Sequence, residues 1–310
     1  MKAVRIHEFG GPDVLKLEEL AKPAPDPGEV LIEVRAASVN PVDYKIREGR
    51  YPPVKADQLP VILGRDVAGV VMKTGGGVAG LAAGDDVFAM LPPDRGGYAE
   101  WVTAPASLCA RKPVSLGMIQ AASVPLAALT AWQALFTHGG LKAEQRMLVH
   151  GASGGVGSFA VQLARARGAQ VYATASTDNL AYVESLGAAR AIDYRRERFE
   201  DVVHDLDLVL DLVGGQVEAR SWQVLRAGGR LISTVQQPDV SRAEQAGVTA
   251  ARFTCQPDGA QLAEIARLID EGQVSVRVDQ VYMLEEAAEA ERHLEDEHVT
   301  GKLVLEVARN

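Results

Sequence analysis

The glycines between positions 151 and 157 have the spacing of a turn that binds phosphate. The segment reads Gly-Ala-Ser-Gly-Gly-Val-Gly and lies between an apolar stretch and a helical pattern that begins near Val156. Glycine lets a backbone turn sharply and approach a diphosphate, which the free N–H groups at a helix start stabilise. A tight turn without a ligand is the alternative. The context favours a dinucleotide site formed by Gly151, Ser153, Gly154, Gly155 and Val156.

The end of the next predicted strand favours NADP over NAD. An NAD site usually has an acidic residue there, about 20 residues beyond the glycines, but this strand ends in small neutral residues. Ser176 and Thr177 provide hydroxyls for a 2′-phosphate, and Arg195 or Arg196 provides a positive charge. Asp178 is the argument for NAD, since its carboxylate would repel that phosphate.

A second group of polar residues provides side chains for hydride transfer to an acceptor. The segment Asn40 to Lys45 reads Asn-Pro-Val-Asp-Tyr-Lys and follows a predicted strand. Hydride transfer leaves negative charge on the acceptor oxygen, and a catalyst has to stabilise that charge. Asn40 is expected to donate to the acceptor or to the cofactor ribose, and Tyr44 to supply a proton or a stacking surface. Asp43 is expected to hold this loop by accepting backbone N–H bonds.

The cysteines and histidines suggest no metal site. Cys109 and Cys255 are far apart, and neither belongs to a CxxC motif. The six histidines include no HExxH pair, so each is expected to be a surface or capping residue. We therefore predict that the chain binds no metal.

Two patterns of secondary structure have to position these residues. The first third of the chain predicts short strands with alternating apolar residues and glycine-rich connections, which fits a small barrel. From about Ser123, strands and helices alternate, which predicts right-handed βαβ units and an α/β fold with a doubly wound Rossmann sheet. The predicted strands are Glu29–Ala36, Val67–Met72, Asp86–Met90, Met147–His150, Val171–Ala175, Ala191–Ile192, Leu206–Leu212 and Arg230–Val235.

The last segments are expected to rejoin the first domain. They comprise a strand near Gln280–Met283, an acidic helix over Leu284–Glu295 and a closing strand over Lys302–Val307. The acidic residues between 285 and 297 are expected to form a solvated helix face. We predict a catalytic domain of residues 1–122 and 272–310, and a dinucleotide-binding domain of residues 123–271.

The composition excludes several classes of protein. The 310 residues are 47% hydrophobic and 24% charged, which suits about two globular domains. The net charge of −9 would repel nucleic acid. No apolar run reaches the ~18 to 20 residues of a membrane span, and the N-terminus lacks a secretory apolar core. We expect a cytoplasmic protein.

Five motifs in this order carry a family resemblance. They are Asn40–Lys45, Gly64–Gly69, Gly84–Val87, Gly151–Gly157 and Gly301–Leu305. The chain resembles the zinc-free quinone oxidoreductases and enone reductases of the medium-chain dehydrogenase/reductase superfamily, the group that includes zeta-crystallin. The resemblance implies a GroES-like β-barrel catalytic domain, a Rossmann domain, NADPH in the cleft between them, and a homodimer.

The resemblance also assigns individual residues. In the metal-dependent relatives, a cysteine and a histidine bind zinc where this chain has Asn40 and Arg65, and the loss of two ligands excludes a catalytic zinc site. The enone reductases are thought to place the positive charge of the residue matching Lys45 beside the forming enolate oxygen; a lysine that only stabilises the loop is the alternative. Lys302 is expected to reach the cofactor or to pair with the acidic helix. Further cofactor contacts are implied for Thr130, Asn179, Tyr194, Val213 and Gly214.

These residues predict an NADPH-dependent oxidoreductase that transfers a hydride to a quinone or to the double bond of an α,β-unsaturated carbonyl. Such acceptors delocalise the developing charge, so hydrogen bonds can replace a metal. Two alternatives are a zinc-free alcohol or aldehyde oxidoreductase and a non-catalytic NADPH-binding protein with a redox-sensing or crystallin-like role.

Overall fold

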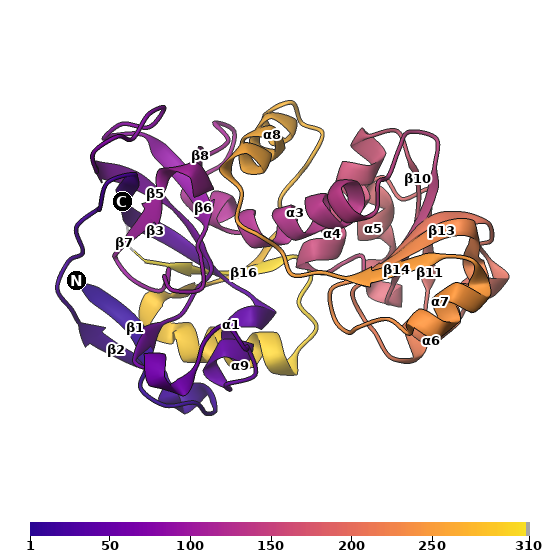
Figure 1. Cartoon of the computed structure of the whole chain (residues 1–310), viewed down its shortest axis with the longest axis horizontal. Helices are drawn as coiled ribbons and strands as arrows, with labels where there is room; N and C mark the ends of the chain where they lie inside the picture. The colour runs from indigo at the N-terminus through magenta and orange to yellow at the C-terminus, as the bar shows by residue number, and fades with distance from the viewer. Residues whose placement is uncertain (308–310) are drawn as a thin grey trace. The chain divides into compact units, whose positions relative to one another are not determined.

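The computed structural model describes residues 1–307, which form two compact units (Figure 1). The first unit contains Met1–Leu126, Pro257–Asp270 and residues 276–307, and the second contains Ala127–Gln256 and Glu271–Ser275. Helix α8 (Gly259–Asp270) packs on strand β8 (Cys109–Arg111) of the first unit, although the sequence assigns it to the second domain. The predicted boundaries separate a catalytic domain from a dinucleotide-binding domain, whereas the two units are defined by packing alone. The predicted boundaries therefore stay predictions.

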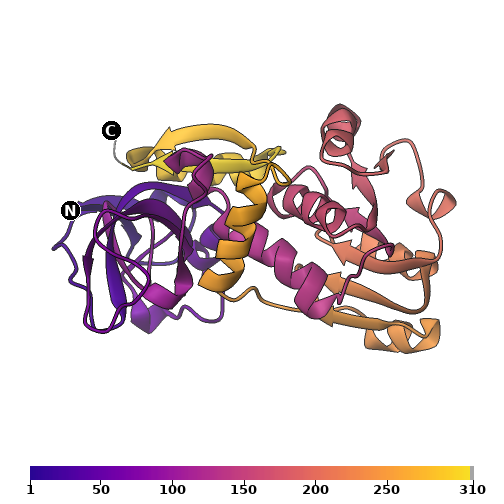
Figure 2. The ribbon, with the colours of Figure 1, turned by 90° about the horizontal axis from the view of Figure 1, so that it is seen from above.

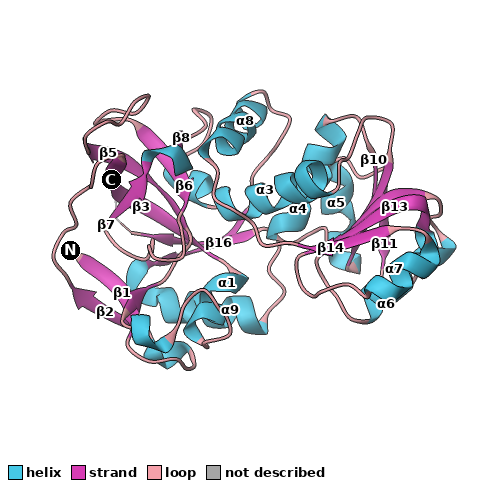
Figure 3. Cartoon of the chain, in the orientation of Figure 1, coloured by secondary structure: helices cyan, strands magenta, loops and turns pink. Residues whose placement is uncertain are grey.

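The first unit consists mainly of strands, as Figure 3 shows. Its larger sheet has the order β15-β16-β3-β5-β6-β8, with β7 paired to β3, and its smaller sheet has the order β2-β1-β4. Besides β8, the strands of this unit are β1 (Lys2–Ile6), β2 (Lys16–Glu19), β3 (Glu29–Val39), β4 (Val61–Ile62), β5 (Asp66–Thr74), β6 (Asp86–Met90), β7 (Trp101–Pro105), β15 (Val278–Met283) and β16 (Lys302–Glu306). The helices of this unit, besides α8, are α1 (Pro41–Arg47), α2 (Met118–Ala122) and α9 (Ala287–Asp296), and α3 (Pro125–Trp132) leads into the second unit.

Strand β3 is the centre of the larger sheet. Val30, Ile32 and Val34 are fully buried, as their alternation predicts. The strand continues three residues beyond its predicted end, because Ala37, Ser38 and Val39 pair with β16. This extension brings the end of β3 next to the C-terminal segment and fixes where α1 begins.

Helix α1 lies where the sequence analysis expects a loop. Asn40 is its N-cap with an extended backbone, Pro41 occupies the first helical position, and the Asp43 side chain accepts a hydrogen bond from the Asn40 backbone N–H at 2.8 Å. This pattern of Asn-Pro and a carboxylate at the third position is a helix-start signature that was present in the sequence. The loop prediction was wrong, whereas the structural role of Asp43 is confirmed.

The second unit contains a six-stranded parallel sheet in the order β11-β10-β9-β12-β13-β14. The chain extends the sheet toward one edge from β9 to β11 and toward the other edge from β12 to β14. In open α/β sheets, ligands bind at the carboxyl ends of the strands beside this change of direction, which here lies between β9 and β12. The connections from β9 to β10 and from β13 to β14 run toward opposite edges of the sheet, so right-handed crossovers place their helices on opposite faces, and Figure 2 shows helices on both sides of these strands. The elements are β9 (Arg146–His150), α4 (Gly155–Ala166), β10 (Gln170–Ala175), α5 (Leu180–Ser185), β11 (Arg190–Asp193), β12 (Leu206–Asp211), α6 (Gln216–Ser221), β13 (Leu225–Ser233), α7 (Val240–Ala246) and β14 (Thr249–Arg252).

This topology confirms the predicted Rossmann sheet, and β14 is a strand that the sequence analysis did not identify. Its four residues are partly exposed and include Thr249 and Arg252, so they lack a continuous apolar run. None of the helices within residues 1–307 has both the length and the apolar character needed to cross a membrane.

Candidate active site

The glycine-rich turn connects β9 to α4 in the second unit. Gly151 has a φ of +75°, a left-handed conformation that glycine adopts without strain. An ideal Cβ on Gly157 would lie 2.2 Å from the Gly151 carbonyl oxygen and 2.6 Å from the Ala152 Cα. No larger residue fits at position 157, so the backbone of the turn packs directly on the first turn of the helix.

The start of α4 suits a diphosphate. Its N-cap is Gly154, whose lack of a side chain leaves the first N–H groups of the helix without a side-chain cap. The first turn consists of the uncharged residues 155–158, and Ser153, Gly155 and Val156 are partly exposed. A twelve-residue helix that begins in this way presents N–H donors and the positive end of its dipole to an anion.

The ends of β10 and β11 bring the predicted adenosine-side residues together. Ala175 and Asp193 are partners in the parallel ladder. The Thr177 hydroxyl donates to Asp193 Oδ2 at 2.6 Å, and Asn179 Nδ2 donates to the Ser176 hydroxyl at 3.2 Å. Tyr194 follows Asp193 directly, and its side chain is exposed.

Asp193 is a residue that the sequence analysis did not identify. Its carboxylate accepts hydrogen bonds from Thr177 and from the Arg195 backbone N–H, at 3.0 Å for the latter, and these contacts hold its pKa below the usual value. Arg196 Nε lies 3.6 Å from the same carboxylate. Because Thr177 already donates to Asp193, its availability to a 2′-phosphate is lower than the sequence suggests.

We predict that the double variant Arg195→Ala/Arg196→Ala binds NADPH about tenfold more weakly, because a 2′-phosphate loses charge-assisted hydrogen bonds. NADH affinity should change by less than about twofold, since NADH lacks that phosphate. Calorimetric titration with both coenzymes measures the difference. Arg198→Ala is the matched control, because Arg198 is also exposed and pairs with Glu200 at 3.2 Å. An equal loss of affinity for NADPH and NADH would contradict the proposed contact of these arginines with the 2′-phosphate.

The end of β12 lies beside the glycine turn. The buried Asp211 carboxylate accepts from the backbone N–H groups of Val213 and Gly214 at 3.0 and 2.8 Å. A Cβ on Gly151 would lie 3.4 Å from Val213 Cγ2, so these two predicted cofactor residues are neighbours. The Val213 side chain is 51% exposed, which leaves it available to a ligand.

Two further polar residues of the second unit are buried. Thr130 lies on α3, and its predicted role toward a nicotinamide stays a prediction. His150 on β9 hydrogen-bonds through Nδ1 to the Thr174 hydroxyl at 3.1 Å and through Nε2 to the Ser221 hydroxyl at 3.0 Å. Burial lowers the pKa of His150 to about 3. The expectation that every histidine lies at the surface or caps a helix was therefore wrong for this one.

In the first unit, Asn40 belongs to a buried polar network. Its Nδ2 donates to Asp66 Oδ2 at 2.9 Å, and the same oxygen accepts from the Ser38 hydroxyl at 2.7 Å. Lys302 Nζ donates to the Val39 carbonyl at 2.9 Å and to Asn40 Oδ1. Asn40 is 1% exposed, so both ends of its amide are used within the protein. Its predicted contact with acceptor or ribose stays a prediction.

Lys302 contacts the N-cap of α1. Its ammonium is buried, and burial lowers its pKa while the nearby Asp66 and Asp43 carboxylates oppose that shift. The hydrogen bonds that the structure gives it lead to the end of β3 and to Asn40. Its predicted contact with the cofactor stays a prediction.

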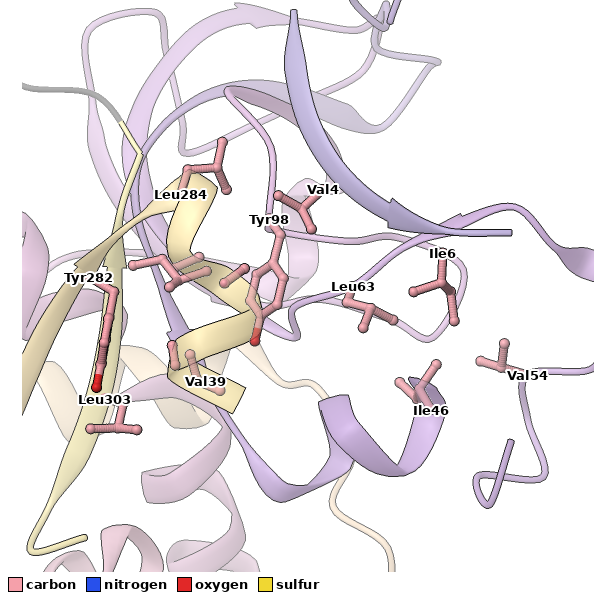
Figure 4. Packing of buried hydrophobic residues seen from close by; sticks show 14 residues of the cluster. Val4, Ile6, Val39, Ile46, Val54, Leu63, Tyr98, Tyr282, Leu284 and Leu303 are labelled. Atoms are coloured by element: carbon pink, nitrogen blue, oxygen red, sulfur yellow. The ribbon is translucent and has the colours of Figure 1, made fainter. Parts of the chain in front are cut away.

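Tyr44 and Lys45 are partly exposed on α1, whereas Asp43, Ile46 and Arg47 form the buried face of this helix. The Tyr44 hydroxyl is protonated at neutral pH, as in an ordinary tyrosine, and burial raises its pKa further. Ile46 packs in a cluster with Val54, Leu63 and Tyr98 (Figure 4). The helix therefore presents a protonated phenol and a lysine on one side and is held to the protein on the other.

The acids behind α1 are unusual. Asp43 is fully buried, and burial raises its pKa to about 7, against the hydrogen bond from the Asn40 backbone. Glu291 on α9 is also fully buried, and burial together with the Asp43 charge raises its pKa to about 8, against the attraction of Arg47. The predicted solvated face of the acidic helix was wrong for Glu291.

These two acids predict a loss of stability with rising pH. Between the ordinary carboxyl pKa and the raised one, the folded protein keeps a proton that the unfolded chain has released, so the free energy of unfolding falls as pH rises. His150 acts in the opposite direction below its ordinary value of 6.5. The fall should therefore be clearest between about pH 6.5 and 8. Denaturant unfolding at several pH values measures this slope, which Glu291→Gln should reduce; an unchanged slope in that variant would contradict the assignment.

The two positions that hold zinc in the metal-dependent relatives have other contacts here. Besides the network of Asn40, Arg65 Nε donates to the Leu91 carbonyl at 2.7 Å and is 3% exposed. Within residues 1–307, no three His, Cys, Asp or Glu side chains are grouped as metal ligands.

Comparisons with known proteins agree with this architecture. Residues 26–114 match the alcohol dehydrogenase GroES-like domain, and residues 186–305 match the family described as zinc-binding dehydrogenase. An NADPH-dependent alkenal/one oxidoreductase of Arabidopsis thaliana chloroplasts is 37% identical over 98% of this chain and 79% of its own length.

Two solved structures cover nearly the whole chain. The quinone oxidoreductase from Coxiella burnetii has a TM-score of 0.91 and 36% identity and covers 99% of both chains. The Escherichia coli quinone oxidoreductase complexed with NADPH has a TM-score of 0.89 and 29% identity, over 99% of this chain and 100% of the other. The chain belongs to the quinone oxidoreductase and enone reductase family of the medium-chain dehydrogenase/reductase superfamily.

Proposed function

We propose that this protein is an NADPH-dependent oxidoreductase that reduces quinones or the double bond of α,β-unsaturated carbonyls. The observation that carries the proposal is the glycine start of α4, where residue 157 admits no side chain and the first N–H groups are uncapped. Relatives named as alkenal/one and quinone oxidoreductases support the class of acceptor. The alkenal/one enzyme is named as NADPH-dependent, which supports the coenzyme.

Separate groups of residues serve the coenzyme and the acceptor. The turn Gly151 to Val156 holds the diphosphate, Ser176 and Tyr194 lie on the adenosine side, and Val213 with Gly214 contacts the nicotinamide. NADPH supplies the hydride when it is bound. The protein has to orient the acceptor and stabilise the charge that develops on its oxygen.

Helix α1 provides the groups for that task. Lys45 places a positive charge near the acceptor oxygen, and Tyr44, which like any tyrosine is protonated at neutral pH, is able to donate a hydrogen bond or a proton. Burial raises the pKa of Tyr44, which favours the hydrogen bond over release of the proton. A quinone or an enone spreads the negative charge over a conjugated system, so these donors suffice where a simple ketone would need a metal ion. Asn40 and Arg65, which have other partners, support a metal-independent reaction.

The reaction is tested by mixing the protein with NADPH and a panel of quinones, alkenals and alkenones. Loss of the nicotinamide absorbance with at least one conjugated acceptor is expected, and treatment with a chelator should leave the rate unchanged. Oxidation of alcohols with NADP in the reverse assay would instead favour an alcohol oxidoreductase. Tight NADPH binding without turnover of any acceptor would favour a binding protein.

We further propose that the protein is a cytoplasmic homodimer, as the family resemblance and the sequence suggest. Light scattering of the purified protein at several concentrations tests the homodimer, and a fluorescent fusion in cells tests the location. A monomeric mass at all concentrations would reject the homodimer.

A further inference from the structure

An arginine and an acid are buried together behind the helix that carries Tyr44 and Lys45. Arg47 on α1 and Glu291 on α9 both have side chains that are 0% exposed. Arg47 Nη1 lies 3.3 Å from Glu291 Oε2, and Arg47 Nη2 contacts Glu295 one turn further along α9. Helices α1 and α9 lie side by side (Figure 1). The arginine therefore connects the end of α1 to two acids of the C-terminal segment.

This arrangement is a poor source of stability. Arg47 Nε, Arg47 Nη1 and both carboxyl oxygens of Glu291 are buried without a hydrogen-bond partner among the described residues. Removing such groups from water is costly, and a buried acid–guanidinium pair with unsatisfied atoms often stabilises a protein less than apolar residues of the same size. Its presence therefore suggests a benefit other than stability.

The geometry of α1 indicates what that benefit is. The helix has seven residues, so it is too short to be stable in isolation, and its orientation depends on what it packs against. The apolar contact through Ile46 is non-directional, so by itself it sets the rotation of the helix about its axis less sharply than a charged contact would. Arg47 Nη2 donates a hydrogen bond to Glu295, and Arg47 Nη1 lies 3.3 Å from Glu291 Oε2, so a rotation of α1 would pull the guanidinium away from both carboxyl groups. Rotating α1 would turn Tyr44 and Lys45 away from the acceptor.

We propose that Glu291 is a positioning residue, which acts through Arg47 to fix the rotation of α1 and thereby the directions of Tyr44 and Lys45. This inference rests on the proposed function, in which those two side chains face the acceptor. The partner network at the other end of the helix, Lys302 with Asn40, holds the N-cap. The short helix is thus anchored at both ends by the C-terminal segment.

The decisive variant replaces the pair by apolar residues of similar size, Arg47→Met/Glu291→Leu. We expect the melting temperature to stay the same or to rise by a few degrees. The turnover rate kcat with an enone or quinone should fall about tenfold, because α1 loses its fixed rotation. The dissociation constant for NADPH should stay within about twofold, since the proposed coenzyme residues are mainly in the other unit. A variant with unchanged kcat would overturn the inference, and so would one in which the melting temperature falls and kcat per folded molecule is retained.

Single variants provide the controls. Above about pH 8, where Glu291 is ionised, Glu291→Gln should lower kcat, and Glu291→Asp should restore part of it, because a carboxylate is again available to Arg47. Glu289→Gln removes an exposed acid from the same helix and should leave kcat unchanged. Equal effects of the changes at 289 and 291 would show that only the charge of α9 matters and would overturn the inference.

A measurement without turnover separates this inference from the proposed function. The acetylation rate of Lys45, followed by mass spectrometry, depends on the direction and surroundings of its amine. We expect this rate to change severalfold in Arg47→Met/Glu291→Leu and to stay constant in Glu289→Gln. If the protein reduces no acceptor, the proposed function fails, but the positioning of α1 is still judged by this rate. An unchanged rate in the double variant would refute it.

Discussion

The substitution Gly157→Ala is expected to weaken NADPH binding strongly and to lower the melting temperature by about 5 °C. A Cβ at this position would lie 2.2 Å from the Gly151 carbonyl oxygen, so the turn has to move away from the helix. Overpacking of this kind costs about 1–3 kcal/mol, and a displaced turn no longer directs its N–H groups at a diphosphate. We expect the affinity for NADPH to fall at least about 100-fold. Differential scanning fluorimetry and a fluorescence titration measure the two effects.

Gly154→Ala is the matched control in the same turn. Gly154 has an ordinary extended backbone, with φ −77° and ψ 177°, and a Cβ there would meet the Gly151 oxygen at 3.6 Å. The fold accepts that contact, so the melting temperature should not change. The added methyl group would still occupy space near the diphosphate, and NADPH should bind about tenfold more weakly. Loss of stability in both variants, with no difference in NADPH affinity, would mean that the turn is only structural.

The glycine turn was predictable from the sequence because its physical requirements are local. A sharp turn, a helix start and the preceding apolar strand all lie within about fifteen residues, and each has its own residue signature. The same holds for β6, whose predicted and observed bounds are identical at Asp86–Met90. Alternating strands and helices also determine the order of the parallel sheet, because right-handed crossovers leave few topologies.

Other features depend on contacts between distant segments. Arg47 and Glu291 are 244 positions apart, and each by itself resembles an ordinary surface charge of a helix. Their burial follows from the pairing of β16 with β3. The sequence predicts that the last segments rejoin the first domain, but no local pattern specifies which strand they pair with. The burial of Lys302 against Asn40 has the same origin. Helix α1 is different, because its local signal, the Asn-Pro start, is present in the sequence. The helix has only seven residues, which is too short to show a helical pattern of apolar residues.

The variant Lys45→Ala is expected to lower kcat about 100-fold, because the acceptor oxygen loses the positive charge that stabilises it in the transition state. The dissociation constant for NADPH should change by less than about twofold, since the proposed coenzyme residues lie mainly in the second unit. Lys45→Arg keeps the charge on a longer and planar group and should retain an intermediate rate. Stopped-flow measurement of NADPH oxidation with a saturating enone isolates this step.

Three outcomes of that experiment have different meanings. A loss of kcat with unchanged NADPH affinity places Lys45 at the acceptor. An equal loss of both would make Lys45 a coenzyme residue. A lower melting temperature with unchanged kcat would mean that Lys45 only stabilises α1.

The variant Tyr44→Phe distinguishes the contribution of Tyr44 from that of Lys45, because it keeps the ring and removes the hydroxyl, whose pKa burial raises. If proton donation by Tyr44 contributes, this variant should lower kcat about tenfold without affecting NADPH affinity, and the effect should persist in the Lys45→Arg background.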